Sequence, residues 1–266
     1  MKRVRPIGAA LLALGATLAL HAGDAWDRAR AVAEKTATSA VRVRVVSEMK
    51  IDNRGQNVER EQKSEIDGTV VDPSGLTVVS ATALNPSSMI SRMMRGMKIE
   101  MNVKETTLLL ADGSEVPSEV VLKDTDLDLA FIRPKEPGKT NTHVALKPHP
   151  TPPQPLDDVF LIGRLGKNAN RALFVNAGKV RACIKGPRPY YICTRDVSET
   201  TGCMVYTADG EALGVLLIQK APGEDGDQGM PLMLGGAGGD LAVVRPVEDV
   251  IEGLKQALEA QPAAKP

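Results

Sequence analysis

Few side chains in this sequence can transfer a proton or attack a carbonyl group near neutral pH. Histidine, whose imidazole titrates in that range, occurs three times, as His21, His143 and His149. Cysteine, whose thiolate is a nucleophile and a metal ligand, also occurs three times, as Cys183, Cys193 and Cys203. A structural zinc site needs C-x₂-C spacing or a nearby histidine, and the sequence has neither. We therefore expect no metal and no cofactor.

The N-terminus has the pattern of a secretory signal peptide. Three basic residues among the first five precede an apolar run from Ile7 to Leu20, which small residues follow. The run is shorter than the roughly 20 apolar residues that cross a bilayer, which favours a cleaved signal over residues 1–22 rather than a retained anchor. We therefore expect a secreted or periplasmic protein, in a compartment that permits a disulfide between Cys183 and Cys193.

The composition favours a core of aliphatic side chains and excludes strongly charged partners. Hydrophobic residues make up 42% of the 266 residues, but aromatic residues only 3%. Valine, leucine and alanine must therefore fill the core, which suits many short strands. The formal net charge is zero, so the charge predicts no nucleic-acid partner and no membrane contact after signal cleavage.

Strand-like runs fall into two groups on either side of a proline-rich stretch from Pro134 to Pro155. The first group covers residues 40–46, 68–72, 76–80, 106–110 and 119–122. The second group covers residues 159–162, 172–181, 190–194, 204–206, 212–218 and 241–244. Helical patterns occur only at the ends, over residues 24–39, with Asp24 as N-cap, and 246–260. This order predicts an all-β protein made of two barrels.

The expected boundaries follow from the same pattern. The predicted parts are a first barrel with its N-terminal helix (24–135), a connector (136–156), a second barrel (157–246), a C-terminal helix (247–260) and a tail (261–266).

Five segments, in order, resemble the protease domain of HtrA-type (Deg) trypsin-like serine proteases. They are Gly68–Leu84, Asp112–Ala130, Val159–Gly163, Asp209–Gly214 and Leu241–Val250. The resemblance covers roughly residues 28–260 and implies a chymotrypsin/trypsin-like double β-barrel with serine endopeptidase ancestry. No PDZ-like sequence follows it, so we expect the peptide-binding module of many relatives to be absent.

The resemblance also assigns the positions of the catalytic triad, in which a serine attacks, a histidine accepts its proton and an aspartate orients the histidine. Asp128 matches the aspartate, but Thr82 stands at the histidine position and Thr201 at the serine position. Glu199 replaces the first glycine of the nucleophile loop, where a carboxylate opposes the developing negative charge.

These replacements predict a degenerate and inactive triad. Thr82 has no group that titrates near neutral pH, and the methyl group of Thr201 crowds the attack. Asp128, without its histidine, is then an aspartate satisfied by local hydrogen bonds. The sequence therefore predicts a pseudoprotease that serves as a binding or scaffolding domain for a protein or peptide partner.

Two other interpretations stay open. One is an active endopeptidase that uses Thr201 or Cys203 with an unrecognised base, which would require His143 or His149 to reach the cleft from the connector. Cys203 as a nucleophile competes with Cys203 as a small buried hydrophobic residue, since no basic neighbour of this thiol is visible. The other is a purely structural envelope protein whose cleft has no ligand.

Two further segments are open to a functional and a plain interpretation. The insertion over residues 85–104 places five methionines at helical or near-helical spacing, which predicts either an adaptable flap over the cleft or simple packing of the loop. The glycine-rich segment from Pro222 to Asp240 lies where the family builds a pocket wall, and it predicts a solvated loop.

Overall fold

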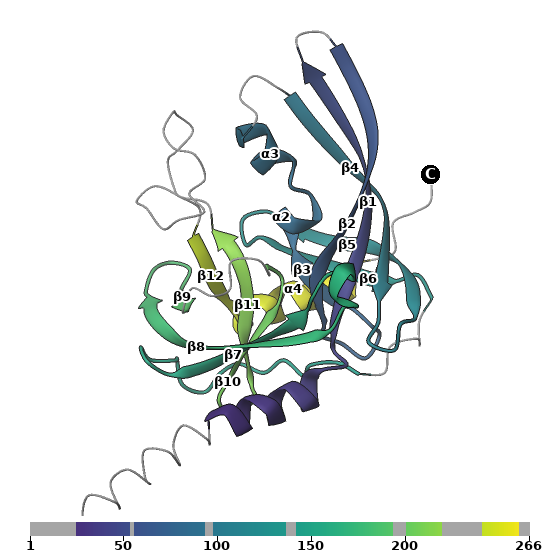
Figure 1. Ribbon diagram of the computed structural model, residues 1–266. Helices are drawn as coiled ribbons and strands as arrows, with labels where there is room; N and C mark the ends of the chain where they lie inside the picture. Colours follow the sequence, from purple (N-terminus) through teal and green to yellow (C-terminus); the bar gives the residue numbers. More distant parts are fainter. Residues whose placement is uncertain are drawn as a thin grey trace, which may run out of the picture.

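The computed structural model describes residues 25–53, 56–93, 98–136, 142–193, 201–219 and 241–260. They form two closed six-stranded β-barrels with a helix at either end of the chain (Figure 1). The expected all-β double barrel is therefore confirmed. The predicted signal peptide, the Asp24 cap, the glycine-rich segment and the tail lie outside the described residues.

The first barrel closes in the order β1-β2-β3-β6-β5-β4. Its strands are β1 (Ala40–Asn53), β2 (Gln56–Val70), β3 (Thr77–Ser80), β4 (Lys98–Leu109), β5 (Glu115–Asp124) and β6 (Leu129–Pro134). Two short helices, α2 (Ala81–Leu84) and α3 (Ser87–Met93), join β3 to β4. Successive side chains of a strand point to opposite faces, so alternate positions fill the barrel. Among them are Val43, Val45, Val79, Leu108 and Ile132.

The second barrel closes in the order β10-β11-β12-β9-β8-β7. Its strands are β7 (Asp158–Arg164), β8 (Leu173–Ile184), β9 (Tyr190–Cys193), β10 (Met204–Thr207), β11 (Ala212–Gln219) and β12 (Leu241–Pro246). A single turn of 3₁₀-helix, η1 (Lys167–Ala169), lies between β7 and β8. The barrel interior is again aliphatic, and includes Val159, Leu161, Val205, Leu213 and Val244.

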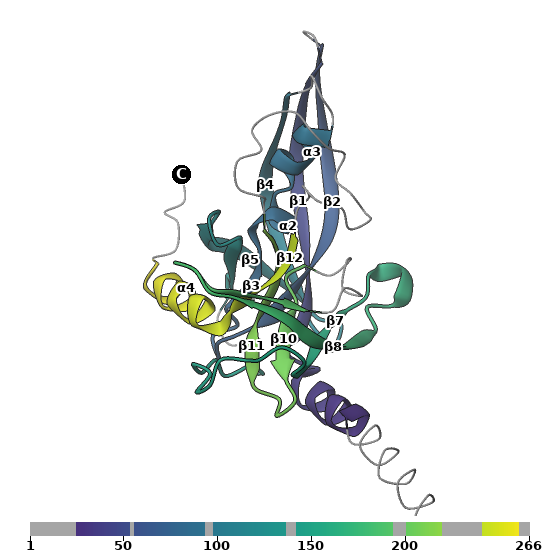
Figure 2. The same ribbon diagram turned by 90° about the vertical axis from the view of Figure 1, so that its left-hand side faces the viewer.

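Each terminal helix packs on the barrel that is distant from it in sequence. The helix over residues 25–36 places Val32 against Gly210 of the second barrel. Helix α4 (Val247–Glu259) follows the second barrel but packs on the first, where a Cβ on Gly253 would come within 2.6 Å of the Phe131 ring. Arg133 of β6 donates hydrogen bonds of 2.5 and 3.1 Å to carbonyl groups at the end of α4. The two helices thus tie the barrels together (Figure 2).

A third apolar cluster lies between the barrels. It contains side chains from both barrels and from both terminal helices, including Leu76, Phe131, Phe160, Met204, Tyr206 and Val250. Three of these are aromatic in a chain with only 3% aromatic residues. The large rings are therefore concentrated where the two barrels meet.

The hairpin of β1 and β2 is longer than the sequence analysis predicted, because that analysis assigned no strand to residues 47–67. The pairing runs without interruption from Ala40 opposite Thr69 to Asn53 opposite Gln56. A β-bulge between Val46 and Ser47 marks the point beyond which β1, β2 and β4 project from the barrel as a three-stranded extension (Figures 1 and 2).

The methionine-rich insertion is helical over Ser87–Met93 and continues into β4 from Lys98. Met89 lies in α3, but Met101 belongs to β4, where it is 7% exposed and opposite Met49 of β1. The Asn85 and Ser91 side chains donate hydrogen bonds to backbone carbonyl groups of β4. Pairing with β1 thus decided the conformation that methionine spacing alone left open. Residues 94–97 of the insertion lie outside the described residues.

A buried ion pair stands where the first barrel meets the second. Arg42 Nη1 of β1 lies 2.6 Å from Asp67 Oδ2 of β2, with side chains only 11% and 4% exposed. Arg42 also donates hydrogen bonds to the carbonyl oxygens of Glu65 and Arg164, and Arg164 belongs to the second barrel. Burial raises the pKa of Asp67, while Arg42 opposes that shift because it stabilises the carboxylate.

Two further arginines, both from the second barrel, reach across to the first. Arg164 donates to the carbonyl oxygens of Ala37 and Ala40 at 2.8 and 2.6 Å. Arg171 forms a bidentate pair with Glu65 of β2 at 3.1 and 2.5 Å, and this pair lowers the pKa of Glu65. The contacts cross the junction in both directions and set the relative position of the two barrels.

We predict that breaking the buried pair is costly but replacing both partners is not. Asp67→Ala should lower the free energy of unfolding by about 3–5 kcal/mol, because it leaves a buried guanidinium unpaired. The double variant Arg42→Met, Asp67→Leu should lose much less than Asp67→Ala alone. Urea unfolding of the three proteins measures both effects.

The matched control is the pair between Arg44 of β1 and Glu115, which is bidentate at 2.8 and 2.6 Å but more exposed. Glu115→Ala should lower the free energy of unfolding much less than Asp67→Ala, because solvent screens this exposed pair. If the Asp67→Ala variant is as stable as the Glu115→Ala variant, the buried pair does not stabilise the junction between the two barrels.

Candidate functional site

Asp128 occupies the turn between β5 and β6, and its carboxylate is fully engaged by neighbouring groups. The residue is 8% exposed, and its φ of 57° is one that aspartate tolerates better than most residues. Oδ1 accepts the backbone N–H of Thr82 at 2.6 Å, and Oδ2 accepts the hydroxyl of Ser80 at 3.0 Å. The Asp128 backbone carbonyl accepts the N–H of Ala81 at 3.0 Å. The residue therefore holds the start of α2.

Thr82 lies in the first turn of α2, where the Ser80 hydroxyl accepts the N–H of Ala83 at 3.0 Å as N-cap. The contact between Thr82 and Asp128 is made by the Thr82 backbone, not by its side chain. The structure thus brings these two predicted site residues together, and their catalytic roles stay predictions. Sequence reasoning missed Ser80, although its position two residues before Thr82 and directly before the helix is typical of an N-cap.

The turn that carries Thr201 packs against the same region of the first barrel. Gly202 has a φ of 99°, and its N–H donates to the carbonyl of Leu216 at 2.7 Å. A Cβ at Gly202 would lie 2.7 Å from the Asp67 carbonyl oxygen and 3.3 Å from the Ser80 nitrogen, so only glycine fits. Thr201 is thus one residue from a contact with Ser80, which itself binds Asp128. Glu199, predicted to disturb the oxyanion pocket, lies outside the described residues.

Cys203 is a buried residue of the second barrel, only 1% exposed. Its sulfur packs so closely on Gly163 that a Cβ there would collide with it, and its thiol is hydrogen-bonded to the Asp67 carboxylate. A neighbouring carboxylate opposes the negative charge of a thiolate. The environment therefore matches a small buried side chain and not an accessible nucleophile.

The two described histidines lie away from Asp128. His143 is exposed and precedes Val144, whose N–H donates to the backbone of Val70 at the end of β2. His149 has its ring nitrogens 2.5 Å from the Thr151 carbonyl and 3.7 Å from a Glu211 carboxylate oxygen. With these contacts, neither histidine ring is positioned to accept a proton from the Thr201 hydroxyl. His21 lies outside the described residues.

Cys183 and Cys193 lie on the neighbouring strands β8 and β9, as expected, but both are free thiols. The register places Cys183 opposite Tyr191 and Cys193 opposite Val180, so the two cysteines do not face each other. Burial raises the pKa of Cys193 to about 12, and the Cys183 thiol donates to the Pro153 carbonyl at 3.1 Å. The predicted disulfide is not formed in this structure.

A groove of about 880 Å³ runs between the outer face of the first barrel and the β7–β8 connection. Its polar walls include Lys63 and Glu105 from the first barrel and Lys167 from the second, and Leu165 adds an apolar surface that is 41% exposed. Arg42 also lines it, and Asp67, the ion-pair partner of Arg42, meets Gly202 with its backbone. None of Thr82, Asp128 and Thr201 lines this groove.

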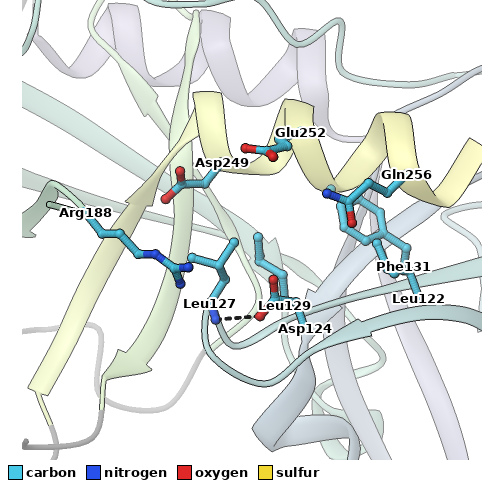
Figure 3. Close-up of a pocket in the computed structure, with 10 residues that line it drawn as sticks. Leu122, Asp124, Leu127, Leu129, Phe131, Arg188, Asp249, Glu252 and Gln256 are labelled. Atoms are coloured by element: carbon cyan, nitrogen blue, oxygen red, sulfur yellow. Dashed lines mark hydrogen bonds between the residues drawn. The ribbon is translucent and has the colours of Figure 1, made fainter.

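A smaller recess of about 260 Å³ lies between α4 and the β5–β6 turn (Figure 3). Figure 3 shows Asp249 and Glu252 on α4, and below this helix Arg188 with Leu127 of the β5–β6 turn beside it. Burial raises the pKa of Asp249, whose carboxylate lies 3.8 Å from Arg245. This volume holds no more than a single side chain, and the Asp128 carboxylate binds groups that do not line the recess.

A family model described as the trypsin-like peptidase domain matches residues 66–215, more than half of the chain. The chain belongs to the trypsin-like peptidase domain family. The matched region of this trypsin-like peptidase domain begins in β2 and ends in β11, so it includes Thr82, Asp128 and Thr201. No curated protein matches the chain.

The described residues of this trypsin-like peptidase domain contain neither a metal-binding cluster nor a membrane-spanning helix. There, no group of three or more histidine, cysteine, aspartate or glutamate side chains is placed to hold a metal ion. Also within the described residues, no helix combines the length and apolarity that a bilayer crossing requires.

We predict that Asp128 contributes to stability through the bonds to Thr82 and Ser80. Asp128→Ala should lower the free energy of unfolding by about 2 kcal/mol, because two buried donors lose a charged acceptor. Asp128→Asn should lose less, since its amide oxygen can still accept the Thr82 N–H. Asp126→Ala, in the exposed part of the same turn, is the control and should change stability by less than about 0.5 kcal/mol. Equal stability of the two alanine variants would refute the structural role.

Proposed function

We propose that this chain is a pseudoprotease of the HtrA type, which binds a protein or peptide and does not hydrolyse it. The observation that carries the proposal is the arrangement at Asp128. The carboxylate that would orient a general base is bonded to the Thr82 backbone and the Ser80 hydroxyl. The residue at the base position is a threonine, which cannot accept a proton near neutral pH.

Acyl transfer by a hydroxyl group requires a base that removes its proton during the attack. Thr201 is partly exposed in its turn, so its hydroxyl is accessible, but the groups brought near it are the Asp67 and Ser80 backbones that contact Gly202. Neither group is a base at neutral pH. The proposed pseudoprotease therefore has the fold of a peptidase but lacks the proton transfer that peptide hydrolysis needs.

The competing function, an active endopeptidase, finds less support. A nucleophilic Cys203 would have to reach solvent from a position that is 1% exposed and beside a carboxylate. His149 would have to leave its contacts with Thr151 and Glu211 to serve as base. Moving Cys203 to solvent would also disturb the core of the second barrel, in which it is packed.

We propose that the partner is an extended polypeptide segment and that it binds in the groove between the first barrel and the β7–β8 connection. The groove combines an exposed apolar surface at Leu165 with unpaired charges of both signs, since neither Lys167 nor Glu105 has an ion-pair partner within the described residues. Such a mixture suits a peptide backbone with varied side chains better than a small uniform ligand. The N-terminal apolar run, which has the pattern of a signal peptide, supports the proposal that this binding takes place in a secreted or periplasmic protein.

The first test is the absence of catalysis. The purified chain should neither cleave unfolded casein nor be labelled by a fluorophosphonate probe, because no base activates Thr201. Trypsin under the same conditions is the positive control for both assays. Casein cleavage that is lost in Thr201→Ala or Cys203→Ala, with the folded structure retained, would overturn the pseudoprotease proposal.

The second test locates the partner. A photo-crosslinking amino acid at Leu165, in the groove, should capture a polypeptide from the envelope or secreted fraction. The same amino acid at Leu258, which is 48% exposed on α4, is the matched control and should capture little. Lys167→Glu should weaken the capture at position 165 several-fold. Equal capture at both positions would contradict the proposal that the partner binds in the groove. No capture at either position would favour a structural protein without a partner.

A further inference from the structure

The three-stranded extension has two outer edges, one along β4 and one along β2, and they differ. β1 lies in the centre, between β2 and β4 (Figure 1). Along β4, the Met101 carbonyl accepts a hydrogen bond of 2.8 Å from the Asn85 side chain. The Ile99 carbonyl accepts one of 3.3 Å from the Ser91 hydroxyl of α3. Side chains that precede β4 therefore satisfy backbone acceptors of that strand.

The edge of β2 is open over Val58–Ser64. β2 pairs with β3 only from Gly68 to Val70, and no other described strand pairs with its outer side. At the base of the extension, the Glu65 carboxylate is bound by Arg171 of the second barrel. Within the described residues, Val58–Ser64 has no side-chain cap like those on β4. The stretch also contains no proline, so each of its residues has a backbone donor.

Alternate residues of this open stretch direct their backbone polar groups away from β1. The Val70 N–H donates at 2.9 Å to the Ser39 carbonyl, directly before β1, so the even-numbered residues of β2 are bonded to β1. The pairing of β1 with β2 has no register shift along its length, so the alternation continues into the extension. Glu59, Glu61 and Lys63 therefore present N–H and C=O groups on the open edge.

The side chains of the same three residues lie on the face that continues into the groove. Lys63 is opposite Val46 of β1, and both residues line the groove. A strand added at the open edge would therefore direct every second side chain to the side of the groove. Directly opposite side chains of paired strands interact, and opposite charges stabilise the pair. Two negative charges, at Glu59 and Glu61, followed by a positive charge at Lys63 thus define a complementary pattern.

Charged side chains along a strand can also discourage pairing between edges, which is the plain interpretation of this stretch. Protection alone does not explain why the edge continues into a groove, since Lys63 and Ser64 belong to both. The same charges that repel an apolar strand select a strand of complementary charge. The open edge and the groove are therefore two parts of one surface, one for a backbone and one for side chains.

We propose that an extended polypeptide adds to β2 over Val58–Ser64 as an antiparallel strand. This rests on the proposed function, because it gives a binding mode to the polypeptide partner that was assigned to the groove. Antiparallel pairing is the more stable arrangement per residue. Main-chain hydrogen bonds then supply affinity, and alternate side chains supply selectivity. In its own N-to-C direction the segment has an acidic residue opposite Lys63 and basic residues opposite Glu61 and Glu59, at every second position.

The first test uses a labelled synthetic peptide, Thr-Val-Glu-Thr-Lys-Glu-Lys-Val-Thr, and fluorescence anisotropy with the purified chain. Its first glutamate lies opposite Lys63, and the two lysines lie opposite Glu61 and Glu59. The control, Thr-Val-Lys-Thr-Glu-Glu-Lys-Val-Thr, has the same composition and net charge but exchanges the residues opposite Lys63 and Glu61. The first peptide should bind saturably, and the control about fivefold more weakly. No saturable binding, or equal binding of both peptides, overturns the proposal.

Backbone methylation tests whether the peptide is held as a strand. N-methylation of the peptide residue opposite Glu61 should abolish binding, because that nitrogen donates to β2. N-methylation of the next residue, opposite Arg60, should leave binding nearly unchanged, because its N–H points away from β2. Equal effects at the two positions would contradict strand addition.

A variant of the protein tests the register. Glu61→Lys combined with Lys63→Glu keeps the ion pair between these two side chains, which lie 3.2 Å apart, and should reverse the preference between the two peptides. The matched control exchanges two exposed charges of α4, Lys255→Glu with Glu259→Lys, and should keep the original preference. An unchanged preference in the β2 variant overturns the proposed pairing.

Failure of strand addition can be told apart from failure of the proposed function. Capture of a polypeptide at Leu165, together with no alternation in the methylation experiment, would leave polypeptide binding standing and refute only the added strand. Mass spectrometry of the peptide after incubation reports hydrolysis. Cleavage of the peptide would refute the pseudoprotease and would not bear on the β2 edge.

Discussion

The buried pair of Arg42 and Asp67 is the contact on which the arrangement of the two barrels depends. It lies at their junction, and its members also contact the second barrel through the Arg164 carbonyl and the Cys203 thiol. The Asp67 backbone meets Gly202 so closely that a side chain there has no room. A pair that takes two charges out of water is kept only where its geometry is well satisfied. Here that geometry places the Thr201 turn beside Ser80 and Asp128.

The same carboxylate that would serve catalysis in a working triad serves the fold in this chain. Asp128 holds the first turn of α2 and the hydroxyl of Ser80, so its retention needs no catalytic explanation. Thr82 adds no base, and Cys203 is enclosed.

Much of the fold follows from local patterns, and the failures have identifiable causes. The short buried strands β3, β7 and β10 are continuous apolar runs, and Asp72-Pro73-Ser74-Gly75 marks a hairpin, so these strands were predictable. Residues 47–67 were not recognised, because the consecutive charged residues Glu59, Arg60 and Glu61 of β2 break the alternation. The conformation of Met101 was left open by its spacing, and pairing with Met49 made it part of a strand. Of the site, Asp128, Thr82 and Thr201 could be proposed from resemblance, but Ser80, Arg42 and Glu65 could not, since their partners are distant in sequence.

The sequence by itself determined the double barrel and the absence of imidazole at position 82, because both depend on residue type and local order. Only the tertiary structure decided what Asp128 binds, that Cys203 is enclosed and that Cys183 does not face Cys193. Those facts depend on strand register and on how two barrels meet, and both are set by contacts between residues far apart along the chain.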